Sequence, residues 1–229
     1  KESALWNIHF PQSQEDIKQA LKYLKYEEFL KFQLTMQLMK QQRTQEMGIA
    51  KDFDVTQLQS LILSLPFALT KDQQTAIKEI VEDLKSPQMM YRFLQGDVGS
   101  GKTVVSSVAL YANYLAGYQG ALMAPTEILA TQHYQTLSRF FENTDVHIEL
   151  LTGSLSLKEK ERVYQAIQSG EADIVVGTHA LFQKKVVYHN LGFVITDEQH
   201  RFGVMQRKAL KNKGQQVDFL IMSATPIPR

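Results

Sequence analysis

The chain has 229 residues, enough for one large domain or for a domain with an appendage at roughly 150 residues per domain. Its 44% hydrophobic and 21% charged residues are ordinary globular usage, which excludes collagen-like, disordered and purely coiled-coil chains. The net charge of +1 neither requires nor excludes a polyanionic partner, whereas the absence of cysteine excludes disulfides, thiolate zinc sites and cysteine nucleophiles.

The sequence contains neither a membrane-spanning stretch of about 20 apolar residues nor a signal peptide at its beginning. We therefore expect no membrane partner, and the lack of cysteine fits a reducing compartment such as the cytoplasm. The chain begins with Lys1 instead of Met and ends at Arg229, so we expect it to be part of a longer protein.

A long helix is the first predicted element. Residues 13–45 contain no Gly or Pro and are rich in strong helix formers, and Ser13 followed by Asp16 resembles a capping box. Apolar residues recur at spacings of three and four and form one stripe; they are Ile17, Ala20, Leu21, Leu24, Tyr26, Leu30, Leu34 and Leu38. A helix of about 30 residues would be about 45 Å long, so we expect residues 1–64 to form a helical connector.

From Leu65 onward, short apolar runs alternate with helical stretches. Thr70 and Gln73 form a second capping box, which opens a helix that should end before Pro87. The predicted strands are 91–94, 121–124, 148–151, 174–176, 193–195 and 219–222. The predicted helices between them are 102–116, 127–141, 157–168 and 206–211. Buried strands separated by helices indicate βαβ units, so we expect residues 65–229 to form an α/β domain with a parallel doubly wound sheet.

A glycine-rich motif lies between the first predicted strand and the helix after it. Its sequence, Gly96-Asp97-Val98-Gly99-Ser100-Gly101-Lys102-Thr103, matches G-x-x-x-x-G-K-[ST] in full. The glycines let the backbone curl so that several N–H groups point at a phosphate, and the helix N-terminus adds a partial positive charge. We expect Lys102 to reach the β- and γ-phosphates of a nucleotide and Thr103 to ligate Mg²⁺. The alternative, a chance turn that caps a helix, is disfavoured by the strand before it and the helix after it.

Two further polar groups follow predicted strands, where open α/β sheets bind ligands. The first is Asp197-Glu198-Gln199-His200. Alone it is typical of an ordinary helix N-terminus, but together with Lys102 it predicts that Asp197 holds Mg²⁺ and that Glu198 orients the attacking water. The second, Ser223-Ala224-Thr225, carries hydroxyls that would relay the state of the first group, although a Ser/Thr turn before Pro226 explains it as well.

These three motifs, in this order, resemble motifs I, II and III of superfamily two helicases of the DExH type. Phe67, Thr70 and Gln73 are similar to the upstream motif whose glutamine reads adenine, and residues 124–130 resemble motif Ia. The resemblance implies a RecA-like P-loop lobe that uses ATP and Mg²⁺. It assigns cofactor binding to Phe67, Gln73 and Gly96–Thr103, catalysis to Lys102, Asp197, Glu198 and His200, metal binding to Thr103 and Asp197, and coupling to Gln199, Ser223 and Thr225.

More narrowly, residues 96–103, 197–204 and 224–229 closely resemble the RecG-type branch-migration helicases of bacteria. That resemblance implies an ATP-dependent DNA helicase lobe that acts on forks and Holliday junctions in repair and recombination, as a cytoplasmic monomer. Motifs IV to VI, with the arginine of a second lobe, are missing, so we expect this chain by itself to lack full activity. One departure from the pattern of these helicases is Thr196, directly before Asp197, where they frequently have an apolar residue.

The first lobe of such helicases tracks one DNA strand through its phosphates, a task suited to hydroxyls and backbone amides at helix N-termini. The resemblance assigns this task to Thr126, Thr152, Ser154, Thr178 and His179.

Two other functions stay open from the residues alone: a P-loop kinase or unrelated NTPase, and a folded binding module without activity of its own. The remaining histidines are scattered along the sequence; they are His9, His133, His147 and His189. We therefore predict no metal site beyond that of the nucleotide Mg²⁺.

Overall fold

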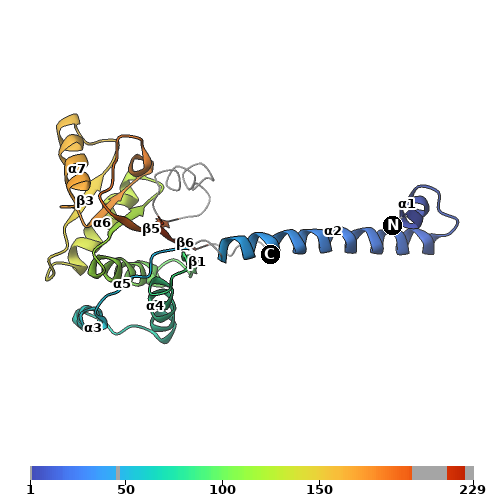
Figure 1. Ribbon diagram of the computed structural model, residues 1–229, viewed down its shortest axis with the longest axis horizontal. Coiled ribbons are helices and arrows are strands. Elements are labelled where there is room, and N and C mark those ends of the chain that lie inside the picture. The colour runs from blue at the N-terminus through green and yellow to red at the C-terminus, as the bar shows by residue number, and fades with distance from the viewer. Residues whose placement is uncertain (1, 45–46, 198–215, 225–229) are drawn as a thin grey trace. The chain divides into compact units, whose positions relative to one another are not determined.

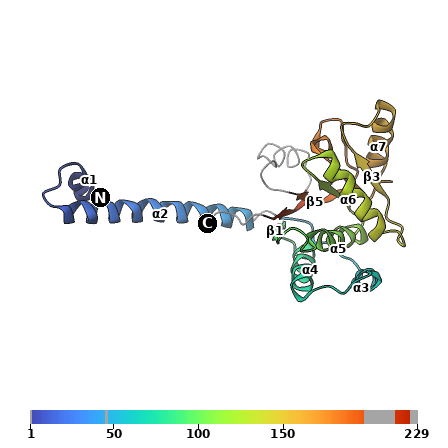
Figure 2. The same ribbon diagram turned by 180° about the vertical axis from the view of Figure 1, so that it is seen from behind.

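The computed structural model describes residues 2–44, 47–197 and 216–224, and it divides into two compact units, Lys1–Glu46 and Met47–Arg229. Figure 1 labels the elements, and Figure 2 shows them from behind. Of the predicted elements, the helix at 206–211 lies outside the described residues. Within the described ranges, no helix is both long and apolar enough to cross a bilayer.

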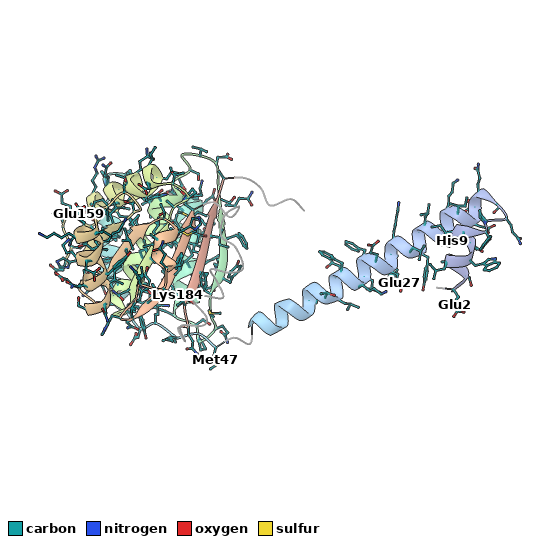
Figure 3. All side chains as sticks on the ribbon, turned by 90° about the horizontal axis from the view of Figure 1, so that it is seen from above. Glu2, His9, Glu27, Met47, Glu159 and Lys184 are labelled. Carbon is teal, nitrogen blue, oxygen red and sulfur yellow. The ribbon has the colours of Figure 1, made fainter. Side chains whose placement is uncertain are left out.

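The first unit consists of a short helix, α1 (Glu2–His9), and a 31-residue helix, α2 (Gln14–Thr44), which confirms the predicted long helix. The Ser13 hydroxyl accepts the backbone N–H of Asp16 at 3.2 Å and donates to its carboxylate at 2.8 Å. Helix α1, which the sequence did not predict, lies against α2. The side chains drawn on α2 project outwards from the helix (Figure 3), and Leu21, Tyr26, Leu30 and Leu34 of its predicted apolar stripe are exposed.

The second unit is built on a six-stranded parallel sheet with the order β1-β6-β5-β2-β4-β3. Its strands are β1 (Tyr91–Gln95), β2 (Gln119–Met123), β3 (Ile148–Leu151), β4 (Ile174–Gly177), β5 (Leu191–Asp197) and β6 (Asp218–Ser223). Its helices are α3 (Val55–Ser64), α4 (Lys71–Leu84), α5 (Lys102–Leu115), α6 (Glu127–Phe140), α7 (Leu157–Ser169) and the short 3-10 helix η1 (His179–Phe182). The predicted doubly wound α/β fold is therefore confirmed.

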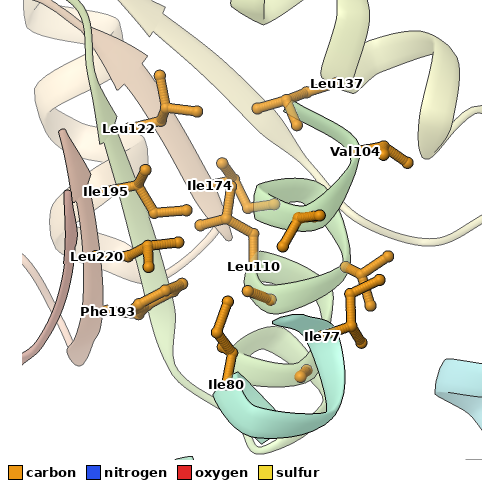
Figure 4. Close-up of a cluster of buried hydrophobic side chains, with 14 of the residues drawn as sticks. Ile77, Ile80, Val104, Leu110, Leu122, Leu137, Ile174, Phe193, Ile195 and Leu220 are labelled. Carbon is orange, nitrogen blue, oxygen red and sulfur yellow. The ribbon is translucent and has the colours of Figure 1, made fainter. Parts of the chain in front are cut away.

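Helices cover both faces of this sheet. Phe193 and Ile195 of β5 join the core beneath α3, α4, α5 and α6, whereas Val194 between them joins the core beneath α7 and η1. Figure 4 shows Phe193 and Ile195 of β5, together with Leu220 of β6, pointing toward Leu110 of α5. Because the central strands are buried on both faces, their sequences are continuous apolar runs without alternation.

The boundary between the two units differs from the expected one. From the sequence we expected the connector to span residues 1–64, but residues 47–64 belong to the same compact unit as the sheet. Phe53, and Leu58 and Leu61 of α3, are buried in the core of this unit, and α3 contacts α5. The physical reason is this burial of apolar side chains on a helix that comes much later in the sequence, a contact that local pattern does not reveal.

Lys51 and Asp218 form a buried ion pair that joins the beginning of this unit to the sheet. Their side chains are 1% and 4% exposed, and the Asp218 carboxylate also accepts the backbone N–H of Met90 at 2.6 Å. Burial raises the pKa of the Asp218 carboxyl, and the Lys51 ammonium opposes that rise. Such a pair adds little stability compared with an apolar replacement, but removing one partner leaves an uncompensated charge inside the protein.

We expect Lys51→Met to lower the free energy of unfolding by about 3–5 kcal/mol, because it strands the Asp218 carboxylate without its cation. Adding Asp218→Asn should restore most of that loss, since the amide oxygen can still accept the Met90 N–H. Urea unfolding of the two variants, with the exposed Lys78→Met as control, measures both effects. A cost below about 1 kcal/mol for Lys51→Met would contradict the buried-charge explanation.

Candidate nucleotide-binding site

The glycine-rich loop joins the carboxyl end of β1 to the N-terminus of α5, as the sequence predicted. Gly99 and Gly101 have φ angles of 80° and 84°, in the left-handed region that favours glycine. Gly101 is also the N-cap of α5, so no side chain caps the helix. The first N–H groups of α5 therefore keep their capacity to bind an anion, and the helix dipole adds positive potential there.

The Lys102 ammonium lies over this loop. Its Nζ donates to the backbone carbonyls of Gly96 at 2.6 Å and Asp97 at 2.9 Å. Both acceptors are neutral oxygens on the same loop, so the cation has no carboxylate partner among these contacts. A phosphate oxygen, which carries charge, would be the stronger acceptor for it.

Gln73 reaches the loop from the N-terminus of α4. Its Oε1 accepts the backbone N–H of Thr70 at 2.9 Å, which completes the predicted capping box, and its Nε2 donates to the carbonyl of Ser100 at 2.9 Å. A Cβ at Gly101 would lie 2.3 Å from that Nε2 and would displace the Gln73 amide, whereas the φ angle is what requires glycine here. Phe67 contacts Phe140 edge-on with ring centroids 6.4 Å apart, and none of its described contacts reaches the loop.

Strand order brings the other predicted groups to the same edge. β6 lies between β1 and β5, with Gln95 paired to Ser223 and Met222 paired to Asp197, and the N–H of Gly96 donates to the carbonyl of Ser223 at 3.2 Å. Asp197 therefore stands two strands from the loop, about 10 Å at the usual strand spacing.

The rest of the second and third motifs lies outside the described residues, namely Glu198, Gln199, His200 and Thr225. Thr196 is fully buried, and its hydroxyl has no hydrogen-bond partner in the described part of the chain. Thr196 thus takes a buried position in β5, where an apolar residue is frequent in such helicases.

His133 is the residue at this site that sequence reasoning missed. Its Nε2 lies 2.8 Å from Oδ2 of Asp197, and the two side chains are 11% and 19% exposed. His133 is on α6 and Asp197 ends β5, so nothing in the local sequence links them. The one available signal was that α6 begins within the stretch that resembles motif Ia.

The predicted DNA-contacting residues gather at the other half of the same edge. Leu151 of β3 and Met123 of β2 both pair with Gly177 of β4, so the three strands end side by side. The hydroxyl of Thr126 caps α6 by accepting the N–H of Leu129 at 3.3 Å. Thr178 is the N-cap of η1, and His179 begins it.

The loop after β3 presents its two predicted residues differently. Ser154 is exposed, whereas Thr152 is buried, and its hydroxyl lies 3.0 Å from that of Ser154. The Lys160 ammonium of α7 donates to the carbonyl of Gly153 at 2.6 Å and ties the loop to that helix. Ser154 is therefore the better placed of the two hydroxyls to meet a ligand from solvent.

Comparison of the sequence with known proteins places the chain among the helicases. Residues 70–229 match the model of the DEAD/DEAH box helicase family. The ATP-dependent DNA helicase RecG of Bacillus subtilis is 53% identical over 227 residues, which cover 99% of this chain and 33% of that protein. The protein of the same name from Thermotoga maritima is 48% identical over 226 residues, covering 99% and 29%. The chain thus spans about a third of the length of these relatives.

Solved structures give the same result. A structure described as RecG bound to a three-way DNA junction superposes with a TM-score of 0.84 at 46% identity, covering 99% of this chain and 30% of that one. The DEAD-box helicase Mss116, at 17% identity and a TM-score of 0.59 over 78% of this chain and 39% of its own, shares the fold. This chain belongs to the DEAD/DEAH box helicase family and is homologous to bacterial RecG over nearly all of its length.

Proposed function

We propose that the chain is the ATP-binding lobe of a DNA helicase that remodels branched DNA, such as forks and Holliday junctions, in repair and recombination. The observation that carries the proposal is the loop before α5, with left-handed Gly99 and Gly101, an uncapped helix start and the Lys102 ammonium on neutral carbonyls. The curated relatives are named ATP-dependent DNA helicases, and one solved relative is described as bound to a three-way DNA junction.

ATP is the nucleotide proposed for this loop. Backbone N–H groups at the start of α5 would bind the phosphates, and Lys102 would exchange its two carbonyl partners for oxygens of the β- and γ-phosphates. Gln73 would read the adenine, in keeping with its position beside the loop. Phe67 would line the base only if its ring leaves the contact with Phe140.

Mg²⁺ suits the oxygen ligands available here. The hydroxyl of Thr103 and the carboxylate of Asp197 are hard donors, and Mg²⁺ takes few protein ligands beside water and phosphate oxygens. Bound there, Mg²⁺ would neutralise charge on the phosphates. Glu198 would orient the attacking water, with His200, Gln199, Ser223 and Thr225 relaying the state of the site.

One DNA strand would cross the other half of the edge. The exposed hydroxyl of Ser154 and the helix starts at Thr126, Thr178 and His179 would bind its phosphates without reading sequence. The whole protein would act as a monomer in the cytoplasm. This chain alone should hydrolyse ATP slowly, because removing a transition-state arginine of a second lobe costs on the order of 10³–10⁵ in rate.

Lys102→Ala should abolish tight binding of ATP, since it removes the cation that pairs with the β- and γ-phosphates. Isothermal titration of this chain with ATP and Mg²⁺ measures the loss. The control is Lys78→Ala, which removes an exposed lysine of α4 whose nearest carboxylate is 3.9 Å away. Unchanged affinity in Lys102→Ala would refute the assignment of the loop.

The full-length protein should hydrolyse ATP faster with a forked DNA than with a linear duplex of equal length and sequence. Steady-state ATPase rates with the two DNAs, at one stated salt concentration, test this. Equal rates would argue for a generic NTPase instead of a motor for branched DNA.

A further inference from the structure

His133 contacts the very carboxylate that is proposed to hold Mg²⁺. Its Nε2 lies 2.8 Å from Oδ2 of Asp197. Carboxylate oxygens accept hydrogen bonds, so the imidazole is the donor from Nε2 in this contact. The contact joins the second turn of α6 to the last residue of β5, and both side chains are largely buried.

This hydrogen bond fixes the orientation of the carboxylate. The terminal torsion of an aspartate has a broad, roughly two-fold profile, so an unrestrained carboxylate at a strand end can rotate. With Oδ2 bound to His133, rotation of the carboxylate is opposed, and within residues 2–44, 47–197 and 216–224 no described hydrogen bond reaches Oδ1. Carboxylates that ligate metals are commonly oriented by such hydrogen bonds, and losing the partner typically costs 10–100-fold in metal affinity.

The surroundings of His133 support a specific role over simple packing. The neighbouring apolar residues of α6 that are fully buried, Ala130 and Leu137, point into the core beneath the helix. His133 lies on the same face of α6, three residues after Ala130 and four before Leu137, and there its polar Nε2 meets the Asp197 carboxylate. A residue needed only to fill space at this position would not require a donor.

We propose that His133 is a positioning residue that holds the Asp197 carboxylate in the orientation that binds Mg²⁺, and so sets the affinity of this lobe for the Mg²⁺ complex of its nucleotide. The inference rests on the proposed function, because it requires a nucleotide at the loop before α5. Neither the sequence motifs nor the names of the relatives assign this role to His133.

The test measures Mg²⁺ affinity by equilibrium binding and does not depend on hydrolysis. This chain is mixed with a fluorescent N-methylanthraniloyl ADP, first in EDTA and then over a Mg²⁺ titration. The variants are His133→Phe, which keeps a ring without the donor, His133→Asn, whose amide is too short to reach Asp197, and His133→Gln, whose Nε2 can reach it. His147→Phe is the matched control, since the His147 side chain is 72% exposed and lies beside Asp173 at the opposite end of the sheet.

We expect His133→Phe and His133→Asn to raise the Mg²⁺ concentration at half-maximal binding by about 10–100-fold, with nucleotide affinity in EDTA unchanged. His133→Gln should bind at a Mg²⁺ concentration close to that of the unaltered chain, because its Nε2 can still donate to Asp197. His147→Phe should leave this concentration unchanged. Circular dichroism checks folding, and the Asn variant carries the test if the Phe variant unfolds.

Two failures are distinguishable. If the unaltered chain binds no nucleotide, the proposed function fails and takes this inference with it. The second outcome is that the unaltered chain binds the nucleotide in a Mg²⁺-dependent manner. If His133→Phe and His133→Asn then reach half-maximal binding at the same Mg²⁺ concentration as the unaltered chain, only the role of His133 is overturned. Equal loss in the Gln variant would likewise show that His133 acts through packing and not through its donor.

Discussion

The start of α5 has no side-chain cap, because the residue at the N-cap position is Gly101 in a left-handed conformation. Within the described part of the chain, no side chain therefore caps the first N–H groups of this helix, which lie at the positive end of its dipole. The rest of the site is arranged around it: the Lys102 ammonium lies over the loop, the Gln73 amide holds Ser100, and Ser223 accepts the N–H of Gly96. A capping side chain here would satisfy the donors that a phosphate needs.

The order of the parallel strands brings the uncapped start of α5 and Asp197 to the same edge of the sheet. Since the strands run in one direction, their carboxyl ends meet at one edge, and β6 between β1 and β5 separates the loop from Asp197 by two strands. The other half of the edge, formed by β2, β4 and β3, carries the residues proposed for DNA. Helix α6 borders both halves, because Thr126 caps its start and His133, in its second turn, contacts Asp197.

The opposite end of the sheet is held by the pair Lys51 and Asp218. Asp218 begins β6, the strand that lies between the loop and Asp197, and it also accepts the N–H of Met90 just before β1. These contacts therefore hold the beginnings of β1 and β6 together, at the end of the sheet opposite the proposed phosphate site. Residues 47–64 belong to this lobe for that reason, together with the burial of α3 on α5.

Features that depend on residues close together in the chain can be recognised from the amino-acid sequence. Helix starts, strand positions and the phosphate-binding loop could be predicted, because the caps at Ser13 and Thr70, the glycines of the loop and the apolar runs of the strands are each encoded within a few residues. The tertiary structure alone decided that Thr152 is buried, that residues 47–64 join the lobe and that His133 reaches Asp197. Each of these depends on side chains separated by many residues in the chain, and their proximity arises only when strands and helices pack around one core, which no local spacing records.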